Sequence, residues 1–343
     1  DDSERRRCTL FPLSSDREER RFEEVLDDEV HAISTDSEQN VLFGGHTLGD
    51  LAAINKGRGF YDVFVGVYDR EGIPQWIWQN GTQVNDVLFG AKYDAEDYIL
   101  LGGHTEGNMA GQGSIYQDAD GKVNYDIWLA RWTGDGEEIW RTQFGTTGND
   151  FLYALASDSS SNLIVGGATN GALCTDRRVK KSSSAGSAGA VGTCTETLCR
   201  RLKTGETAVY ESNTCYSYNV WLAKFTKDGA EVWSKVFGTD GYDKVDTIFV
   251  DDDDNIFVGG SVSGDQIDGT VTGGVNQGTG GTNNAGGTTN DIWIAKYTSD
   301  GTQDWITQFG SEGVDYVSSI AVNSFEKLYF GGATSSNFGT LNI

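Results

Sequence analysis

The chain has few basic residues and no long apolar segment. Lysine plus arginine number 26 against 51 aspartates plus glutamates, so the formal net charge is −25 over 343 residues. Such a chain is repelled by nucleic acid and by anionic membrane surfaces, and counterion release does not help it to bind them. No apolar run approaches the roughly 20 residues of a membrane span. We therefore expect neither nucleic-acid binding nor membrane insertion.

Signatures of catalysis are also missing. The only histidines are His31, His46 and His104, and no Gly-x-Ser-x-Gly elbow, phosphate loop or His-Glu-x-x-His pair occurs. His46 and His104 occupy equivalent positions after a Gly-Gly pair, where the other modules have Ala or Ser. We therefore expect these histidines to be residues that the scaffold accommodates rather than catalytic bases. Paired carboxylates for glycoside hydrolysis stay open, because acidic residues are everywhere. The expectation is a protein that is not an enzyme and requires no cofactor.

What the chain does contain is a repeat of 42 residues. Four plain copies cover 62–103, 126–167, 219–260 and 291–332, and a worn copy covers about 4–45. Each plain copy starts with Asp or Asn before an apolar and aromatic run and closes with Gly-Gly. The turn glycines are Gly72, Gly136, Gly229 and Gly301. The tryptophans that follow them are Trp76, Trp140, Trp233 and Trp305. The recurrent aspartates are Asp28, Asp86, Asp150, Asp243 and Asp315. Repetition on this scale is typical of a propeller, a solenoid or an array.

Within a module the apolar period is that of β-strands. Ile292 and Ile294 alternate with Trp293 and Ala295, and the hairpin cue Asp300-Gly301 follows. Four short antiparallel strands per module predict one propeller blade. The fold class is therefore all-β, a single β-propeller domain over 1–343 that forms a five-bladed ring or part of a larger one. A β-solenoid or a string of sandwiches is the alternative, and a helical solenoid is excluded.

The modules resemble a known family, the SBBP-type β-propeller repeat of secreted and surface proteins. The matching stretches are 291–297, Asp300-Gly301, 309–315 and 329–338. The resemblance covers all five modules, weakly in the first, and it implies a fold but no catalytic residues. Two departures from the family are the long inserts and the presence of five units rather than seven.

The segments between modules vary while the modules do not. They hold 16, 22, 51 and 30 residues, and the two longest are the inserts 168–218 and 261–290. In the usual blade order they would join an outer strand to the next inner strand. They would then emerge on the same face as the Phe-Gly-x-x-Gly-x-Asp loops. A variable face on a constant scaffold indicates a binding or assembly surface.

Cysteine usage indicates an extracellular setting. Four cysteines lie in the insert 168–218 and a fifth, Cys8, stands apart; the four are Cys174, Cys194, Cys199 and Cys215. Two disulfides are expected there, with the pairing open and a zinc site as the rival. Cys8 is either free or bonded to another chain. Asn80 begins the glycosylation sequon Asn80-Gly81-Thr82.

Acidic residues suggest one candidate metal site. Asp118, Asp120, Asn124 and Asp126 place oxygen donors at alternate positions around Gly121, as calcium loops do. A plain acidic turn is the competing interpretation. The recurrent aspartates are expected to accept hydrogen bonds from backbone amides of their own loops, and a ring of them that holds cations is the alternative. Residues 251–254 are expected to be a solvated hairpin tip.

Two functions from different classes follow. The first is an extracellular structural protein, a propeller protomer that packs with copies of itself or with other surface proteins in a layer, adhesin or filament. The second is a glycan- or protein-binding module that uses the insert face, with or without calcium.

Overall fold

The computed structural model describes residues 27–52, 59–110, 124–171, 218–263, 267, 290–323, 325 and 327–336, apart from residues 147, 240 and 312. This part of the chain is all-β, with eighteen strands and no helix, as the sequence predicts. The first sheet contains β1 (Asp28–Thr35), β2 (Val41–Thr47), β3 (Asp62–Tyr68) and β4 (Pro74–Asn80). The second contains β5 (Asp86–Tyr93), β6 (Ile99–Thr105), β7 (Asp126–Trp132) and β8 (Glu138–Phe144). The third contains β9 (Asp150–Ser157), β10 (Leu163–Thr169), β11 (Asn219–Phe225) and β12 (Glu231–Phe237). The fourth contains β13 (Asp243–Val250), β14 (Ile256–Val262), β15 (Asp291–Tyr297) and β16 (Gln303–Phe309). The fifth contains β17 (Asp315–Val322) and β18 (Leu328–Thr334).

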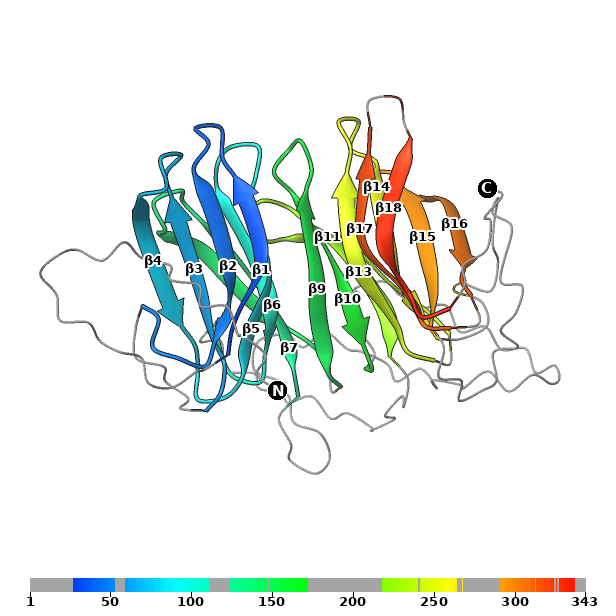
Figure 1. Cartoon of the computed structure of the whole chain (residues 1–343), viewed down its shortest axis with the longest axis horizontal. Helices are drawn as coiled ribbons and strands as arrows, with labels where there is room; N and C mark the ends of the chain where they lie inside the picture. The colour runs from blue at the N-terminus through cyan, green and yellow to red at the C-terminus, as the bar shows by residue number, and fades with distance from the viewer. Residues whose placement is uncertain are drawn as a thin grey trace, which may run out of the picture.

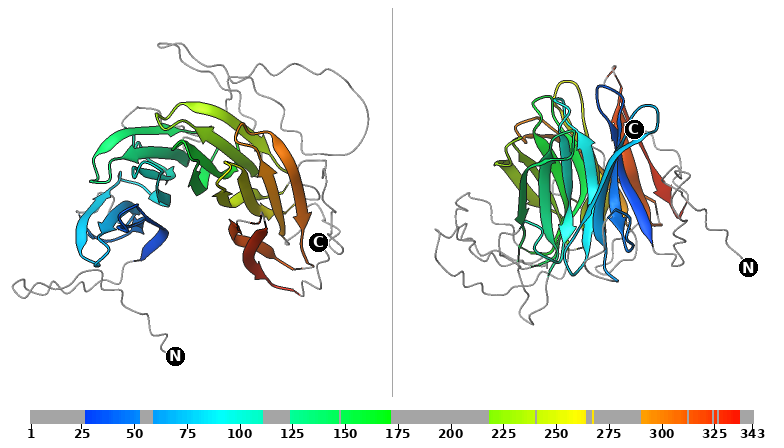
Figure 2. Two further views of the ribbon diagram at one scale, coloured as in Figure 1. Left: turned by 90° about the horizontal axis from the view of Figure 1, so that it is seen from above. Right: turned by 90° about the vertical axis from the view of Figure 1, so that its left-hand side faces the viewer.

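The sheets stand side by side in an open arc (Figures 1 and 2). Strands that are adjacent in sequence pair antiparallel within each sheet, and the first strands of successive sheets contact one another on the inner side. The first and last sheets do not meet, so the described residues do not form a closed ring. The last sheet has two strands where the others have four.

The prediction that one module forms one blade is wrong: the sheets are offset from the modules by two strands. A sheet combines the last two strands of one module with the first two of the next, so the module 62–103 supplies β3 and β4 to the first sheet and β5 and β6 to the second. The variable segments, such as 46–61, therefore connect β2 to β3 inside a sheet rather than one sheet to the next. The connection between sheets is the short Phe- or Asn-Gly loop, for example 81–85.

The expectation that both kinds of segment lie on one face is nevertheless confirmed for their described ends. The backbone amide of Glu106, just after β6, donates to the carbonyl of Asn85 in the loop between β4 and β5 (3.0 Å). Asn170 and Asn149 repeat this bond in the third sheet at 3.2 Å. The hairpin turns lie at the opposite end of the strands (Figure 1). Among them is the Asp251–Asp254 tip, where the carboxylate of Asp251 accepts amide hydrogen bonds.

The core lies between the sheets. Leu42 and Val65 of the first sheet pack with Leu88 and Trp128 of the second, and similar clusters join each later pair of sheets. The third-strand tryptophans Trp128, Trp221 and Trp293 are at most 1 % exposed. An aromatic side chain buries about 150–250 Å², so at about 25 cal/mol per Å² each contributes roughly 4–6 kcal/mol before entropy is counted. The prediction that aromatics form the core is confirmed.

The fourth-strand tryptophans join neighbouring sheets at the turn glycines. The indole N–H of Trp140 donates to the carbonyl of Lys227 (2.8 Å), and its ring packs on Gly229 in the next sheet. Gly229 has φ +82°, which an L residue seldom adopts. Trp76 and Trp233 make the same contacts. Trp305 has no such partner among the described residues, because the next sheet ends after two strands.

The described residues include no helix long and apolar enough to cross a membrane.

The recurrent aspartates accept hydrogen bonds at each sheet-to-sheet connection, as predicted. Asp150 is buried and accepts from the backbone amide of Thr146 (2.5 Å), its hydroxyl (2.9 Å) and the hydroxyl of Thr169 (2.5 Å). Asp86, Asp243 and Asp315 accept the amide of the equivalent loop residue. Burial raises the pKa of Asp150 to about 7, against the opposing effect of these hydrogen bonds.

Replacing this carboxylate should destabilise the fold. We expect Asp150→Ala to lower the free energy of unfolding by about 2–4 kcal/mol, because buried donors on Thr146 and Thr169 lose their acceptor. Asp28→Ala is the matched control, since Asp28 is exposed and should cost less than about 1 kcal/mol. Urea denaturation followed by tryptophan fluorescence measures both, and equal losses would contradict the assignment.

Candidate functional site on the inner edge of the sheets

Every first strand carries a β-bulge at the same position. The bulged residues, which the pairing with the second strand skips, are His31, Phe89, Tyr153, Asp246 and Ser318. Bulges redirect side chains and are common beside functional sites. Because the first strands line the inner side of the arc, these residues form a strip along it, which we name the bulge strip.

The bulge strip is continuous across the first three sheets. The rings of His31 and Phe89 lie 4.4 Å apart between centroids, and those of Phe89 and Tyr153 lie 5.4 Å apart. The residue after the Gly-Gly pair in the second strand packs against the bulged residue of its own sheet. His31 stacks on His46 at 4.7 Å, and Phe89 stacks on His104 at 5.3 Å. In the fourth sheet the hydroxyl of Ser261 donates to Asp246 (2.5 Å).

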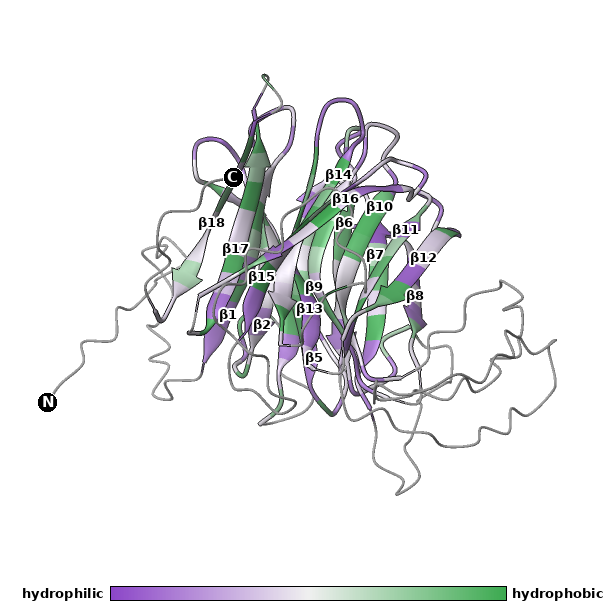
Figure 3. Cartoon of the chain, turned by 90° about the vertical axis from the view of Figure 1, so that its right-hand side faces the viewer, coloured by the Kyte–Doolittle hydropathy of each residue, from purple (hydrophilic) through white to green (hydrophobic). Residues whose placement is uncertain are grey.

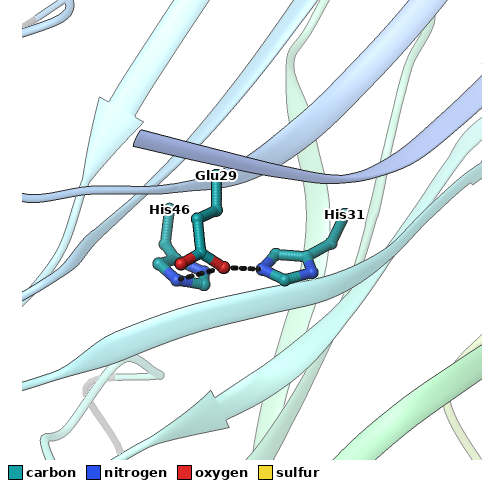
Figure 4. A group of neighbouring side chains, drawn as sticks. All are labelled: Glu29, His31 and His46. Carbon is teal, nitrogen blue, oxygen red and sulfur yellow. Dashed lines mark ion pairs between the residues drawn. The ribbon is translucent and has the colours of Figure 1, made fainter. Parts of the chain in front are cut away.

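The first sheet brings two imidazoles and a carboxylate together. A carboxylate oxygen of Glu29 lies 3.2 Å from Nε2 of His31 and 3.8 Å from Nε2 of His46 (Figure 4). Each residue offers a ligand atom, and the three atoms lie within 4.8 Å of one another. Glu29 and His31 come from β1, two residues apart, and His46 comes from the paired β2. Tyr61 packs edge-on to the ring of His46 at 4.5 Å.

Burial sets the protonation of this group. It lowers the pKa of His46 to about 4, helped by the charge of His31 and opposed by Glu29. Burial also lowers the pKa of His31, against the effect of Glu29. Both rings are therefore neutral at pH 7, and the neutral imidazole of His31 donates a hydrogen bond from Nε2 to the Glu29 carboxylate. Nδ1 of His46 is buried and has no hydrogen-bond partner among the residues that the structure describes. A neutral imidazole next to a carboxylate can bind a metal ion or a polar ligand.

The calcium site predicted from the sequence is only partly described. Asp118 and Asp120 lie outside the described residues, while Asn124 and Asp126 are buried at the start of β7. Asp126 accepts a hydrogen bond from Nε2 of Gln143 (3.0 Å), and Asp291 in the fourth sheet accepts one from Gln308 (3.1 Å). Asp126 thus has a counterpart in a sheet without the calcium-loop pattern, which favours a role in the scaffold. The calcium loop stays a prediction.

The other sequence candidates are not tested by the described residues. Cys8, Cys174, Cys194, Cys199 and Cys215 all lie outside them, so the disulfides stay a prediction. Asn80 ends β4, is partly exposed, and its Oδ1 accepts the amide of Gly81 (3.0 Å). Its glycosylation also stays a prediction.

The sequence did not reveal the Glu29, His31 and His46 group. His46 occupies the same repeat position as His104, which favours a scaffold role, and no sequence motif contains His31. One usable signal existed: counted from Asp28, His31 falls at the position of Phe89 and Tyr153. The bulge that turns this residue towards the second strand has no sequence signature of its own here.

Comparisons with known proteins give no family for the chain. No protein-family model matches it, and no curated protein matches it. A crystal structure of a protein of unknown function from Bacteroides caccae has a TM-score of 0.33 at 9 % identity, covering 83 % of each chain. Sqt1 from Chaetomium thermophilum has a TM-score of 0.29 at 11 % identity, covering 86 % of this chain and 75 % of its own. At these scores neither likeness supports a functional argument.

The buried His104 generates a testable pH dependence. Burial lowers its pKa to about 3, against the effect of a hydrogen bond with the Leu152 backbone. Its pKa in the unfolded chain is near 6.5, so between pH 6.5 and 3 the unfolded state binds the extra proton. The protonation of His104 therefore does not reduce the free energy of unfolding above pH 6.5, and it reduces it progressively as the pH falls from 6.5 towards 3.

Replacing His104 by serine, which occupies the equivalent position 261, should remove this loss. Between pH 7 and pH 4.5 the wild type should lose about 3 kcal/mol more unfolding free energy than His104→Ser. Urea titrations at several pH values measure the difference. Parallel curves for the two proteins would show that His104 takes up its proton in the folded state.

Proposed function

We propose that the protein is a non-enzymatic, extracellular scaffold protomer of propeller type that associates head to tail with further copies of itself. The observation that supports this proposal is the complementarity of the two ends of the arc. Each end carries one half of a contact that joins every pair of neighbouring sheets inside the chain.

Inside the arc, the first glycine of each Gly-Gly pair receives an apolar side chain from the next sheet. A Cβ at Gly44 would lie 3.1 Å from Leu88, and one at Gly102 would lie 3.0 Å from Leu152. At Gly166 and Gly259 the nearest atoms belong to Val245 (2.9 Å) and Ile320 (2.5 Å). Leu88, Leu152 and Val245 stand two residues after the recurrent aspartate of their strand, and Ile320 stands five residues after it, with Val317 at the first position 3.2 Å from the same Cβ. Residues at these two positions of the first strand therefore pack on the glycine of the preceding sheet.

The last sheet offers the glycine without the partner. A Cβ at Gly331 would meet no described atom within 4 Å. The strand β18 is mostly exposed, whereas its counterparts β6, β10 and β14 are buried along their whole length. Figure 3 shows this end of the arc, with apolar residues along the upper half of β17.

The first sheet offers the partner without the glycine. Val30 is 55 % exposed and Ile33 is 74 % exposed. Their counterparts in the second sheet, Leu88 and Ala91, are 0 % and 5 % exposed because the first sheet covers them. Val30 and Ile33 therefore present the surface that fits a glycine such as Gly331.

A second copy fits these ends better than the N-terminal residues of the same chain. In the repeat register, residues 4–22 correspond to a third and a fourth strand, which the last sheet does not have among the described residues. They place Arg5, Arg6 and Arg7 where the described third strands carry buried apolar residues. A contact between unlike ends is heterologous, so it generates a closed ring or an open filament according to its rotation.

The cysteine-rich insert supports a location outside the cell.

The test is the sedimentation of variants at the two ends. The wild type should associate as its concentration rises. Gly331→Leu and Ile33→Asp should weaken association about 100-fold or more. The leucine would occupy the space into which the side chain of the second copy packs, and the aspartate would bury a charge in the contact. Val232→Asp is the matched control: Val232 is 48 % exposed on β12, away from both ends, and its substitution should leave association unchanged.

Analytical ultracentrifugation from about 1 to 100 μM covers dissociation constants in that range, which correspond to association free energies of roughly 5.5–8 kcal/mol. A wild type that stays monomeric throughout this range contradicts the proposal. So does association that survives both end variants.

A further inference from the structure

We propose that Glu29, His31 and His46 form a binding site for one divalent transition-metal ion, with Zn²⁺, Ni²⁺ and Cu²⁺ as the class of ligand. The site lies on the inner edge of the first sheet, on the same strand β1 that carries Val30 and Ile33, and all three of its ligands come from one copy of the chain. It differs from the calcium loop predicted around Asp120 in both position and donor type.

The donor set selects this class of ion. Two imidazole nitrogens and one carboxylate oxygen suit zinc and its neighbours in the transition series, whereas calcium and magnesium prefer oxygen alone. Three protein ligands leave a fourth position open, as in sites that keep a water or an exogenous ligand.

The distances fit a tetrahedral ion. With metal–ligand bonds of about 2.1 Å, neighbouring donors in a tetrahedron lie about 3.4 Å apart. Glu29 lies 3.2 Å from His31 and 3.8 Å from His46, on either side of this value (Figure 4). All three donor atoms fall within 4.8 Å of one another, so movements of side chains alone bring them to bonding distance.

The histidines are held in place before any ion binds. His46 is 6 % exposed, and its ring is confined by His31 and Tyr61. The separation of 3.8 Å between His46 Nε2 and Glu29 is too long for a hydrogen bond. With Nδ1 also unpartnered, the buried imidazole has no hydrogen-bond partner for either nitrogen among the described residues. A metal ion shared with Glu29 and His31 would be bound by Nε2 of His46. Glu29, 53 % exposed in its side chain, leaves the site open to solvent.

The scaffold itself does not require these three residues. At the position of Glu29 the later sheets have Val87, Phe151, Lys244 and Tyr316. At the position of His31 they have Phe89, Tyr153, Asp246 and Ser318. At the position of His46 they have His104, Ala168, Ser261 and Ala333. No later sheet combines two imidazoles with a carboxylate, although all share the backbone that positions them.

The sister sheets also supply the test variants. His31→Phe and His46→Ala copy residues that the same fold accepts at Phe89 and Ala168, so they remove ligands with little strain. Glu29→Gln removes the charge and keeps the shape. His104→Ala is the matched control, because it removes an imidazole from the equivalent position of the second sheet, where no carboxylate among the described residues pairs with it.

The probes are Co²⁺, for its visible absorption in a tetrahedral site, and Zn²⁺ in competition with a chromophoric chelator. The wild type and His104→Ala should bind one equivalent tightly, in 0.5 M salt that screens weak binding to the acidic surface. His31→Phe and His46→Ala should lose this equivalent or bind it at least about 100-fold more weakly, and Glu29→Gln at least about tenfold. The cysteines are unchanged in all four variants, so thiolate sites do not contribute to the differences.

Unchanged stoichiometry and affinity in His31→Phe would overturn the proposal, as would loss of the equivalent in His104→Ala. Circular dichroism of the metal-free variants checks that each is folded. If His46→Ala unfolds, His31→Phe decides the matter, because a phenylalanine already stands at the same bulge in the second sheet.

Discussion

The packing of an apolar side chain from one sheet onto a glycine of the preceding sheet sets the geometry of the arc. A Cβ at Gly102 would lie 3.0–3.1 Å from side-chain carbons of Leu129, Leu152 and Leu155, closer than ordinary van der Waals contact. This close approach brings the first strand of each sheet against the second strand of its neighbour. A larger residue at any of the four internal glycines would push two sheets apart, so the glycines determine the spacing on which the inner edge depends.

The inner edge follows from this spacing. Since the first strands are packed side by side, one face of each packs against the preceding sheet, and the bulge turns one residue per sheet onto the inner edge, where His31, Phe89 and Tyr153 contact one another. That residue is free to vary, and it does: the strip carries an imidazole, a benzene ring, a phenol, a carboxylate and a hydroxyl in turn. Constant packing next to a variable residue is the arrangement in which a repeated fold acquires a local site.

Much of the fold could be predicted from the sequence, because it depends on local spacing. The alternation around Trp293, the hairpin at Asp300-Gly301 and the loop role of Asp150 all depend on neighbours close in the chain, and the structure agrees with each. The phase of the sheets could not be predicted. In a periodic sequence any residue of the repeat can be the first residue of a sheet. The long variable segments indicate boundaries between sheets, although they lie within sheets. Hydrogen bonds show instead that β2 and β3 pair across the first of them.

The candidate site was harder to predict, for a related reason. Glu29 and His31 are close in sequence, but His46 joins them only through the antiparallel register of β1 and β2 and the bulge between Val30 and Ala32. One residue more or less in that register would turn His31 to the opposite face of the strand. The repeat itself obscured the signal, because His46 matches His104, and a matched position is normally interpreted as scaffold.

The placement of the long segments inside the sheets has a consequence for the integrity of the molecule. A protease that cuts between β10 and β11 severs the peptide chain, but the two pieces remain joined by a seven-residue ladder from Leu163–Phe225 to Thr169–Asn219. Each piece then contributes two strands to the third sheet, β9 and β10 from one piece and β11 and β12 from the other. The contacts between sheets described above are made by residues outside 172–217, so a change of length or sequence in that segment does not replace any residue that makes them.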